Sequence, residues 1–274
     1  MKPLQWFIQD PMTDRLSRDL ASGALHEAIT EIAEAAARVI LPFWRVGTAV
    51  ETKSDDSPVT QADQQAEALI LKLLEAVYPE VQAVAEEAVA ADGMPTHAAD
   101  RFWLIDPLDG TKGFISGKES FTVNIALIQD GTPVAGVVTA PATSVSWRTG
   151  TADGARVALR RRFGETWQPI RVRDRPNDGI ALVSHSMNDD EATRLAARHG
   201  CTRWQGMDSS MKFCLLAEGR FDSYPRTGPT HEWDTAAGQA VLEAAGGRVL
   251  GADGAPLDYG KPGFRNGPFV AMGG

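Results

Sequence analysis

Two aspartates, Asp106 and Asp109, stand three positions apart behind an apolar run in the stretch LIDPLDGTKGF at residues 104–114. Pro107 fixes its own φ and disfavours helix at Asp106, so the chain is expected to turn where the strand ends. A sharp turn can leave the carbonyl of Leu108 unpaired and directed outward. Two carboxylates and a carbonyl are the oxygen ligands that hard cations such as Mg²⁺ prefer. The spacing therefore indicates a candidate metal site built on a turn.

The residues after this turn have the types that bind an anion. Thr111 is a good helix N-cap, and a helix that starts there leaves its first backbone N–H groups without partners. Such amides form a nest for a phosphate group, here from Gly110, Thr111 and Lys112. Asp-Pro and Asp-Gly are also common turn dipeptides, so the stretch taken alone is equally consistent with an ordinary turn.

Three more carboxylates fall at the ends of expected elements. Glu86 follows a short buried strand at residues 81–85, and Asp234 opens a helix of small residues. Asp63 lies three residues after Thr60, where the partner in a capping box would be. Each has an ordinary explanation by itself, because an aspartate at a helix start is often only an N-cap. Their joint occurrence at element ends favours a shared site.

Hydrophobic periodicity predicts the elements that would bring these groups together. The N-terminal part is predicted to hold two helices, two buried strands and two hairpins, at residues 25–43, 60–77, 81–85, 101–105, 121–140 and 144–159. The C-terminal part is predicted to hold a strand, two helices, a strand and a helix, at residues 180–184, 189–199, 208–218, 221–224 and 234–245, followed by terminal strands. This order predicts a mixed α/β (α+β) protein with layers of helices and largely antiparallel sheets.

A length of 274 residues fits one large domain or two intimate lobes. Gly, Pro, Asn and Asp cluster at residues 163–178, and the lobes are expected to join there. We interpret residues 1–22 as an N-terminal extension. Residues 23–165 would form an α+β lobe with most of the metal ligands, and residues 166–274 an α/β lobe that carries Asp234 and the remaining substrate contacts.

Charge and composition restrict the partners. A net charge of −9 argues against a nucleic acid polymer, and the RRR run at residues 160–162 is expected to be a solvated strand end. No apolar run approaches the roughly 18 residues that span a bilayer, and no signal peptide is expected. We expect a cytoplasmic monomer or homodimer with reduced thiols at Cys201 and Cys214. A peripheral position at the inner membrane surface stays open.

Several motifs together resemble the inositol monophosphatase-type superfamily: SPVTQAD, VAEEA, WLIDPLDGTKGF and EWDTAAG. The resemblance covers about residues 23–260. It implies a layered α-β-α-β-α sandwich and a Mg²⁺-dependent, lithium-sensitive phosphomonoesterase. Within the superfamily, FTVNIALI, GVVTAP, SSMKFCLLAEG and YPRTGPT are similar to the CysQ type, the 3′(2′),5′-bisphosphate nucleotidases.

The resemblance implies two or three bound Mg²⁺ ions. Glu86, Asp106 and the carbonyl of Leu108 would hold one ion. Asp106, Asp109 and Asp234 would hold a second, with Asp106 bridging the two. Paired cations about 3.5–4 Å apart would offset the carboxylate charge, activate water and stabilise the leaving oxygen.

The resemblance also implies roles in turnover and binding. Asp63 and Thr111 would orient and deprotonate the attacking water, and a third, weaker ion would lie between Glu86 and the Asp63 side. No Ser, Cys or His nucleophile is needed, so water is expected to attack the phosphate directly. The substrate would contact Glu86, Leu108, Asp109, Gly110, Thr111, His185, Ser209, Lys212, Arg226 and Asp234.

Fewer residues indicate which phosphate ester is the substrate. Ser209 and Lys212 lie three apart on one predicted helix face. The resemblance places them, with Arg226, at the sugar and the non-scissile phosphate of a nucleotide, and His185 near it. Their ordinary alternative is a surface lysine, a surface arginine and a loop histidine.

The sequence departs from the CysQ pattern next to Asp234. His231 and Glu232 replace the Asn-Ile that typically precedes the tryptophan, and Thr227 replaces a phenylalanine. These changes can tune substrate choice and leave the metal ligands intact.

The expected reaction converts 3′-phosphoadenosine 5′-phosphate to AMP and phosphate, and its sulfated form to adenosine 5′-phosphosulfate. An inositol monophosphatase or a sugar (bis)phosphatase with the same chemistry is the main alternative. A non-catalytic sensor of phosphate ligands is an alternative from another class.

Overall fold

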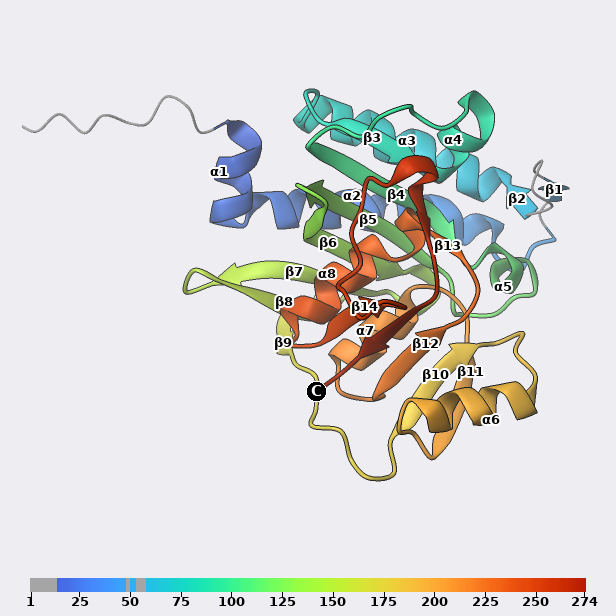
Figure 1. Ribbon diagram of the computed structural model, residues 1–274. Helices are drawn as coiled ribbons and strands as arrows, with labels where there is room; N and C mark the ends of the chain where they lie inside the picture. The colour runs from blue at the N-terminus through green and yellow to red at the C-terminus, as the bar shows by residue number, and fades with distance from the viewer. Residues whose placement is uncertain (1–13, 48–49, 53–57) are drawn as a thin grey trace, which may run out of the picture.

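The computed structural model describes residues 14–47, 50–52 and 58–274, and Figure 1 shows how its elements are arranged. Within these ranges the larger sheet runs in the order β3 (Gln82–Ala85), β4 (Arg101–Asp109), β5 (Thr122–Gln129), β6 (Thr132–Ala140), β7 (Val145–Ala152), β8 (Ala155–Arg162) and β9 (Gln168–Ile170). The smaller sheet runs in the order β11 (Arg203–Met207), β10 (Ile180–Ser184), β12 (Ser223–Arg226), β16 (Phe269–Met272) and β14 (Arg248–Gly251). Two short ribbons pair β1 (Val50–Thr52) with β2 (Pro58–Thr60) and β13 (Thr230–His231) with β15 (Arg265–Asn266).

Helices cover and separate the two sheets. α2 (Ala24–Ile40) and α3 (Gln61–Val77) pack on one face of the larger sheet. α7 (Met211–Ala217) and α8 (Ala236–Ala244) lie between the sheets. α6 (Asp189–Arg198) packs on the outer face of the smaller sheet. This layering confirms the predicted α-β-α-β-α sandwich. The other helical segments are α1 (Arg15–Ser22), η1 (Leu41–Phe43), α4 (Glu86–Asp92), α5 (Thr111–Ile115), η2 (Pro141–Thr143), η3 (Glu232–Asp234) and η4 (Pro262–Phe264).

β4 explains why the run before Asp106 is continuously apolar. Trp103 and Ile105 pack with α2 and α3, whereas Phe102 and Leu104 pack on the opposite face toward α8. Side chains alternate across a strand, and here both faces are covered by helices. Every position from 102 to 105 is therefore buried. The same packing fixes where the strand delivers Asp106.

The structure differs from the prediction at several element ends. β4 continues through Pro107, and its register against β5 shifts between Asp106 and Asp109. α7 begins at Met211 rather than near residue 208, because Ser209 has a left-handed φ of 62° that a helix cannot include. The strand β11 and the helix α4 are additional elements. Three strand pairs are parallel: β3–β4, β10–β11 and β10–β12.

The arginine run at residues 160–162 was predicted to be solvated, and that prediction was wrong for two of its members. Arg160 pairs with Glu218 at 3.0 Å, and Arg161 pairs with Glu34 at 2.9 Å. Both carboxylates are nearly buried, so the strand's cations neutralise acids on α2 and at the end of α7. The sequence run alone could not reveal these partners, because they lie more than 50 residues away.

Residues 1–13 of the predicted N-terminal extension lie outside the described residues. Residues 15–22 form α1, whose Leu16 is buried in the same core cluster as α2 and α3. Tyr78 Oη donates to Asp19 at 3.1 Å, and Arg101 pairs with Asp14, so α1 belongs to the packed fold. No helix within the described ranges is long and apolar enough to cross a membrane. The division into lobes at 165/166 stays a prediction.

Candidate active site

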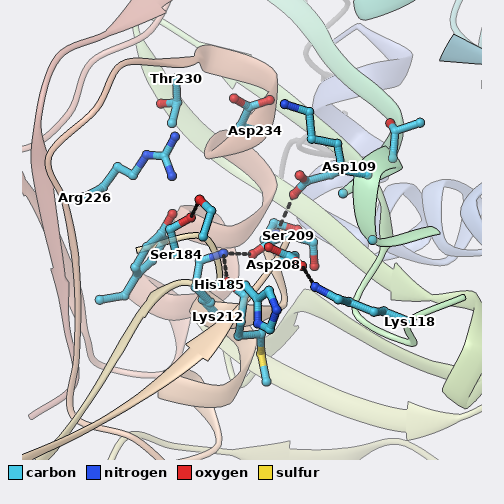
Figure 2. Close-up of a pocket in the computed structure, with 18 of the residues that line it drawn as sticks. Asp109, Lys118, Ser184, His185, Asp208, Ser209, Lys212, Arg226, Thr230 and Asp234 are labelled. Carbon is cyan, nitrogen blue, oxygen red and sulfur yellow. Dashed lines mark hydrogen bonds and ion pairs between the residues drawn. The ribbon is translucent and has the colours of Figure 1, made fainter. Parts of the chain in front are cut away.

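A cavity of about 540 Å³ collects most of the predicted site residues (Figure 2). Its walls come from the segments that follow β4, β10 and β11, together with β12, β13 and the start of α8. The predicted residues that line it are Glu86, Asp109, Gly110, Thr111, His185, Ser209, Lys212, Arg226 and Asp234. Asp63, Asp106 and Leu108 are buried and do not belong to this lining. Residues from both parts of the chain thus meet at one place.

The turn after Asp106 is closed by its own side chain. Asp106 is 1% exposed, and its Oδ1 accepts a hydrogen bond from the Leu108 N–H at 3.0 Å. The Leu108 carbonyl was predicted to be unpaired, which was wrong, because it accepts from Thr111 Oγ1 at 3.0 Å. Thr111 is the first residue of α5 rather than its N-cap. Gly110 occupies the cap with φ 95°, and a Cβ there would lie 2.9 Å from the Ser120 carbonyl oxygen.

Asp63 completes a helix cap and also lies next to Thr111, its predicted partner in activating water. It completes the capping box of α3, where its Oδ2 accepts from the Thr60 N–H at 2.9 Å and from Thr60 Oγ1 at 2.6 Å. Its Oδ1 lies 3.3 Å from the donor Thr111 Oγ1. Burial raises the pKa of Asp63 above its ordinary value. The helix cap therefore holds a carboxylate at hydrogen-bond distance from a cavity hydroxyl.

Glu86 is positioned by a residue that sequence reasoning missed. Glu86 begins α4, and the carboxylate of Glu67 accepts the next two backbone N–H groups, those of Glu87 and Ala88, at 2.7 Å each. Glu67 is 3% exposed and lies one helical turn after Asp63 on α3. Its spacing from Asp63 was the only signal in the sequence. α3 thus fixes both Asp63 and the start of the helix that carries Glu86.

Asp109 is held by a buried polar group between the two sheets. Its Oδ2 accepts from the Ser210 backbone N–H and, at 3.4 Å, from Asn124 Nδ2. Ser210 Oγ donates to Asn124 Oδ1 at 2.6 Å and lies 2.9 Å from Thr122 Oγ1. Sequence reasoning missed these residues. An asparagine inside the apolar strand FTVNIALI was the available signal, because a buried amide requires partners.

Asp234 ends the short turn η3 and does not cap α8, which begins after Thr235. Its Oδ2 accepts from the His231 N–H at 2.9 Å. The ring of His231 stacks on Trp233 with centroids 4.4 Å apart. His231 and Glu232 do not line the cavity, so an effect of their departure from the family pattern on substrate choice would have to act through neighbouring residues.

Four carboxylates, which we call the acidic floor, share one electrostatic environment: Glu86, Asp106, Asp109 and Asp234. Burial raises the pKa of Asp106, Asp109 and Asp234, and the neighbouring carboxylates raise it further. For Asp109 the charge of Lys212 acts in the opposite direction. Like charges removed from water repel strongly, so the acidic floor is suited to hold positive charge.

The chemistry of the acidic floor fits magnesium. Its donors are carboxylate oxygens and one nearby carbonyl, which suit hard cations and not softer metals. Within residues 14–47, 50–52 and 58–274, no three acidic, histidine or cysteine side chains already stand grouped as a metal site. Asp106, Asp109 and Asp234 accept hydrogen bonds from their own backbone surroundings instead. The residues therefore supply the right ligands, and their side chains would converge on an ion.

The cavity is also lined by two cations, Lys212 and Arg226, which we call the cationic wall. Lys212 is 4% exposed, donates to the carbonyls of Ser209 at 2.6 Å and Met207 at 3.2 Å, and lies 4.7 Å from the Tyr224 ring centroid. Burial lowers the pKa of Lys212 to about 8. Arg226 forms no ion pair with any described residue, and its buried Nε has no hydrogen-bond partner. The arginine therefore has donors to offer to an anion.

The cavity rim contains residues that the sequence did not single out. Lys118 Nζ lies 3.3 Å from Asp208 Oδ2, and this pair joins the loop after α5 to the loop before α7 (Figure 2). Ser184 ends β10, the exposed His185 follows it, and both line the cavity. His185 is thus placed at the cavity as predicted by resemblance, although its side chain makes no contact that would assign it a role.

Comparison with known proteins agrees with this architecture. The profile of the inositol monophosphatase family matches residues 23–269. The chain therefore belongs to the inositol monophosphatase family. It is 42% identical to the 3′(2′),5′-bisphosphate nucleotidase CysQ of Salmonella typhimurium over 248 residues, which cover 87% of this chain and 98% of that protein. It is 44% identical to the protein of the same name from Escherichia coli K12, over 79% of this chain and 87% of the relative.

Solved structures give the same result. The crystal structure of CysQ from Bacteroides thetaiotaomicron matches with a TM-score of 0.74 and 30% identity, over 92% of this chain and 97% of the other. An inositol monophosphatase from Anabaena matches with a TM-score of 0.71 and 27% identity, over 92% and 91%. These similarities confirm the predicted superfamily and the resemblance to its CysQ type.

Proposed function

We propose that this protein is a Mg²⁺-dependent 3′(2′),5′-bisphosphate nucleotidase that converts 3′-phosphoadenosine 5′-phosphate to AMP and phosphate. One observation carries the proposal: a single cavity is lined by three carboxylates of the acidic floor, Glu86, Asp109 and Asp234, and also by Lys212 and an arginine without an ion pair among the described residues. A substrate with two phosphates would satisfy the acidic floor and the cationic wall at once. The names of the curated relatives support the same activity.

Two to three Mg²⁺ ions would be held by the ligands that the family resemblance assigns. These are Glu86, Asp106 and the Leu108 carbonyl for one ion, and Asp106, Asp109 and Asp234 for another. Bound magnesium would neutralise the floor, polarise the phosphate and lower the cost of forming the attacking and leaving oxyanions. The repulsion among the free carboxylates supports this assignment.

Asp63 and Thr111 would handle the proton of the attacking water. The Thr111 hydroxyl lies between two acceptors, Asp63 Oδ1 at 3.3 Å and the Leu108 carbonyl at 3.0 Å. If it donates to Asp63, its own lone pair can accept a proton from water in the cavity. The raised pKa of Asp63 makes that carboxylate a better base at neutral pH. Water then adds to phosphorus, the bond to the 3′ oxygen breaks, and that oxygen takes up a proton.

Recognition would fall to the cationic wall. The first amides of α5, after Gly110, would hold the scissile phosphate. Arg226, Lys212 and Ser209 would contact the second phosphate and the ribose. An inositol monophosphate carries one phosphate, which would be bound at the metals, and it would bring no second phosphate for Arg226. This difference favours the bisphosphate over the main alternative.

A substrate panel with Mg²⁺ tests the proposal, with released phosphate as the readout. The panel contains 3′-phosphoadenosine 5′-phosphate, adenosine 3′-monophosphate, inositol 1-phosphate and a sugar bisphosphate, each with and without Li⁺. We expect the bisphosphate nucleotide to have the highest kcat/KM, by about a hundredfold over inositol 1-phosphate. The reverse order would contradict the proposal. Binding of Mg²⁺ and nucleotide without any turnover would favour a sensor instead.

A further inference from the structure

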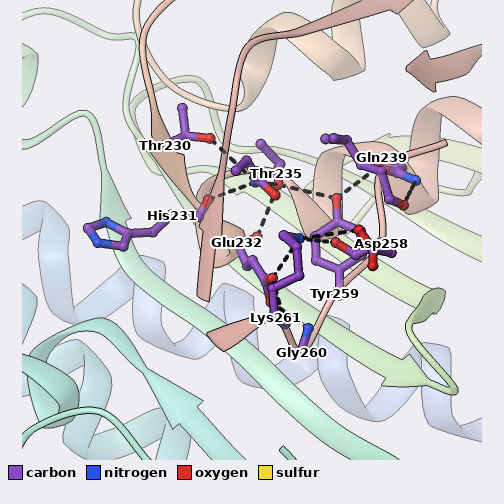
Figure 3. A network of polar contacts seen from close by, with 11 residues as sticks. Thr230, His231, Glu232, Thr235, Gln239, Asp258, Tyr259, Gly260 and Lys261 are labelled. Atoms are coloured by element: carbon purple, nitrogen blue, oxygen red, sulfur yellow. Dashed lines mark hydrogen bonds and ion pairs between the residues drawn. The ribbon is translucent and has the colours of Figure 1, made fainter. Parts of the chain in front are cut away.

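A single turn of chain carries two acidic side chains that point in opposite directions. The turn η3 (Glu232–Asp234) lies between β13 and α8. Asp234 faces the cavity, whereas Glu232 lies on the other side in the polar network of Figure 3 and is 0% exposed. Glu232 therefore sits two residues from a proposed metal ligand without access to the substrate. Its fully buried charge requires an explanation, because an uncompensated buried carboxylate is strongly destabilising.

The carboxylate of Glu232 is satisfied by a distant segment of the chain. Its Oε2 accepts from the Gly260 N–H at 2.7 Å, and its Oε1 accepts from the Lys261 N–H at 3.1 Å. Lys261 Nζ pairs with the same carboxylate at 2.7 Å (Figure 3). Two backbone amides and one ammonium thus fix it in place. Gly260 adopts φ 87°, a left-handed conformation that favours glycine and presents this amide to Glu232.

The same segment is tied to the residue on the other side of Asp234. Tyr259 Oη lies 3.2 Å from Thr235 Oγ1 and 2.7 Å from Gln239 Oε1 on α8. Thr235 Oγ1 donates to the Glu232 carbonyl at 3.1 Å. A closed ring of contacts therefore runs from the Glu232 side chain through residues 259–261 to Thr235 and back to Glu232. The ring brackets Asp234 without touching its carboxylate.

We propose that Glu232, anchored by Lys261 and the amides of residues 260–261, is a positioning residue that sets where Asp234 presents its carboxylate to the metal. The proposal rests on the proposed function, because it requires Asp234 to be a metal ligand. Partners that orient a ligand of a metal tune the affinity for that metal. Glu232 acts through the turn, so its loss should weaken metal binding much more than nucleotide binding.

The test measures binding of Mg²⁺ alone by isothermal titration calorimetry, together with the Mg²⁺ dependence of turnover. Glu232→Gln keeps the side-chain shape, but its amide NH2 group would face the donors that the carboxylate accepts from, namely the two backbone amides and the Lys261 ammonium. We expect it to raise the Mg²⁺ dissociation constant about tenfold. At saturating Mg²⁺, the KM for 3′-phosphoadenosine 5′-phosphate should stay within about twofold of wild type.

Asp222→Asn is the matched control. Asp222 is equally buried, accepts from the Ile180 N–H at 2.7 Å and pairs with Arg173 at 2.8 Å, yet it does not line the cavity. Its loss should cost stability and leave Mg²⁺ affinity unchanged. If Glu232→Gln shifts Mg²⁺ affinity no more than Asp222→Asn does, Glu232 is only structural and the proposal is wrong.

Lys261 provides a second route if Glu232→Gln does not fold. Lys261→Met keeps both backbone hydrogen bonds and removes the ammonium, so it should weaken Mg²⁺ binding by a smaller factor. Lys261→Arg should restore the affinity, and failure of either expectation contradicts the proposal. Measurements on the wild-type protein distinguish a failure of the proposed function from a failure of this inference. If wild type itself neither binds nor uses Mg²⁺, the proposed function fails along with this inference; if it does both, only the inference is at stake.

Discussion

The acidic floor and the cationic wall differ in charge and in how completely their polar atoms are paired. In the floor, Asp106 and Asp109 each accept a hydrogen bond from a backbone amide. On the side of the smaller sheet, Arg226 has no ion pair among the described residues and keeps a buried nitrogen without a partner. The acidic floor is suited to hold positive charge, whereas Arg226 of the cationic wall keeps an unused donor. We expect catalysis to depend on the acidic floor and the choice of phosphate ester to depend on the cationic wall.

The largest effect should come from removing a ligand of the acidic floor. Asp109→Asn and Asp234→Asn should each lower kcat by about a thousandfold on every ester, because several kcal/mol of metal-dependent stabilisation are lost. Released phosphate at saturating Mg²⁺ measures this. Thermal unfolding without Mg²⁺ is the control, and the melting temperature should not fall, since repulsion within the floor decreases. Retention of more than about a tenth of the wild-type rate would refute the ligand role.

A smaller loss should follow from removing the hydroxyl that links water to Asp63. Thr111→Val should lower kcat by about a hundredfold with little change in KM, because proton transfer typically contributes at least that factor. Thr111→Ser retains the hydroxyl and is the matched control. Equal activity of the two variants would mean that the hydroxyl has no role in turnover.

Substitutions in the cationic wall should reduce activity on the bisphosphate nucleotide more than activity on a monophosphate. Arg226→Met should reduce kcat/KM for the bisphosphate nucleotide by about 10- to 100-fold, the value of a charge-assisted hydrogen bond. Turnover of adenosine 3′-monophosphate should change little, and the ratio of the two substrates is the readout. Lys212→Ala should show the same selectivity, but Lys212 also bonds two carbonyls. Equal losses on both substrates would indicate structural damage rather than recognition.

The smallest effect concerns stability and pH. Burial raises the pKa values of Asp106, Asp109 and Asp234 above the ordinary value of 3.8. At a pH between the ordinary and the raised values, these carboxyl groups are protonated in the metal-free folded state and ionised in the unfolded state. Lowering the pH below neutrality should therefore stabilise the metal-free protein, on the order of 1 kcal/mol for each unit of pKa shift. Saturating Mg²⁺ should remove this gain. Urea unfolding at several pH values, with and without Mg²⁺, measures it.

A buried histidine should have the opposite effect on stability as the pH falls. Burial lowers the pKa of His26 to about 4, and its Nδ1 lies 3.0 Å from Thr149 Oγ1. The unfolded state binds this proton first, so stability falls as the pH drops from about 6.5 toward 4. His26 does not line the cavity, and no acid of the floor is among the groups that shift its pKa, so its contribution should be the same with and without Mg²⁺. A pH profile that does not depend on Mg²⁺ would contradict the assigned role of the floor.

Local patterns predicted a mixed α/β protein and carboxylates at the ends of its elements, whereas the layered sandwich and the sets of metal ligands were implied by the family resemblance. Helical spacing fixed α2 and α3, and the Asp-Pro-Leu-Asp-Gly-Thr signature placed Asp106 and Asp109 at a strand end. Sequence reasoning missed residues that matter only because they contact distant parts of the chain. Glu67 matters because α4 starts beside it, and Ser210 matters because its amide reaches Asp109 across about 100 residues. The direction of side chains could not be predicted either, because the motif EWD does not indicate that the side chain of Glu232 points away from the cavity.

The helix α3 has a consequence for how this protein can change over evolutionary time. Asp63 and Glu67 lie one turn apart, so the same face of the helix serves the pair proposed to activate water and the start of α4. A single inserted or deleted residue between them would rotate one carboxylate by about 100° relative to the other. Substitutions on the outward face of this turn can accumulate freely. A change in its length should not survive, because no compensating substitution restores the angle between the two acids.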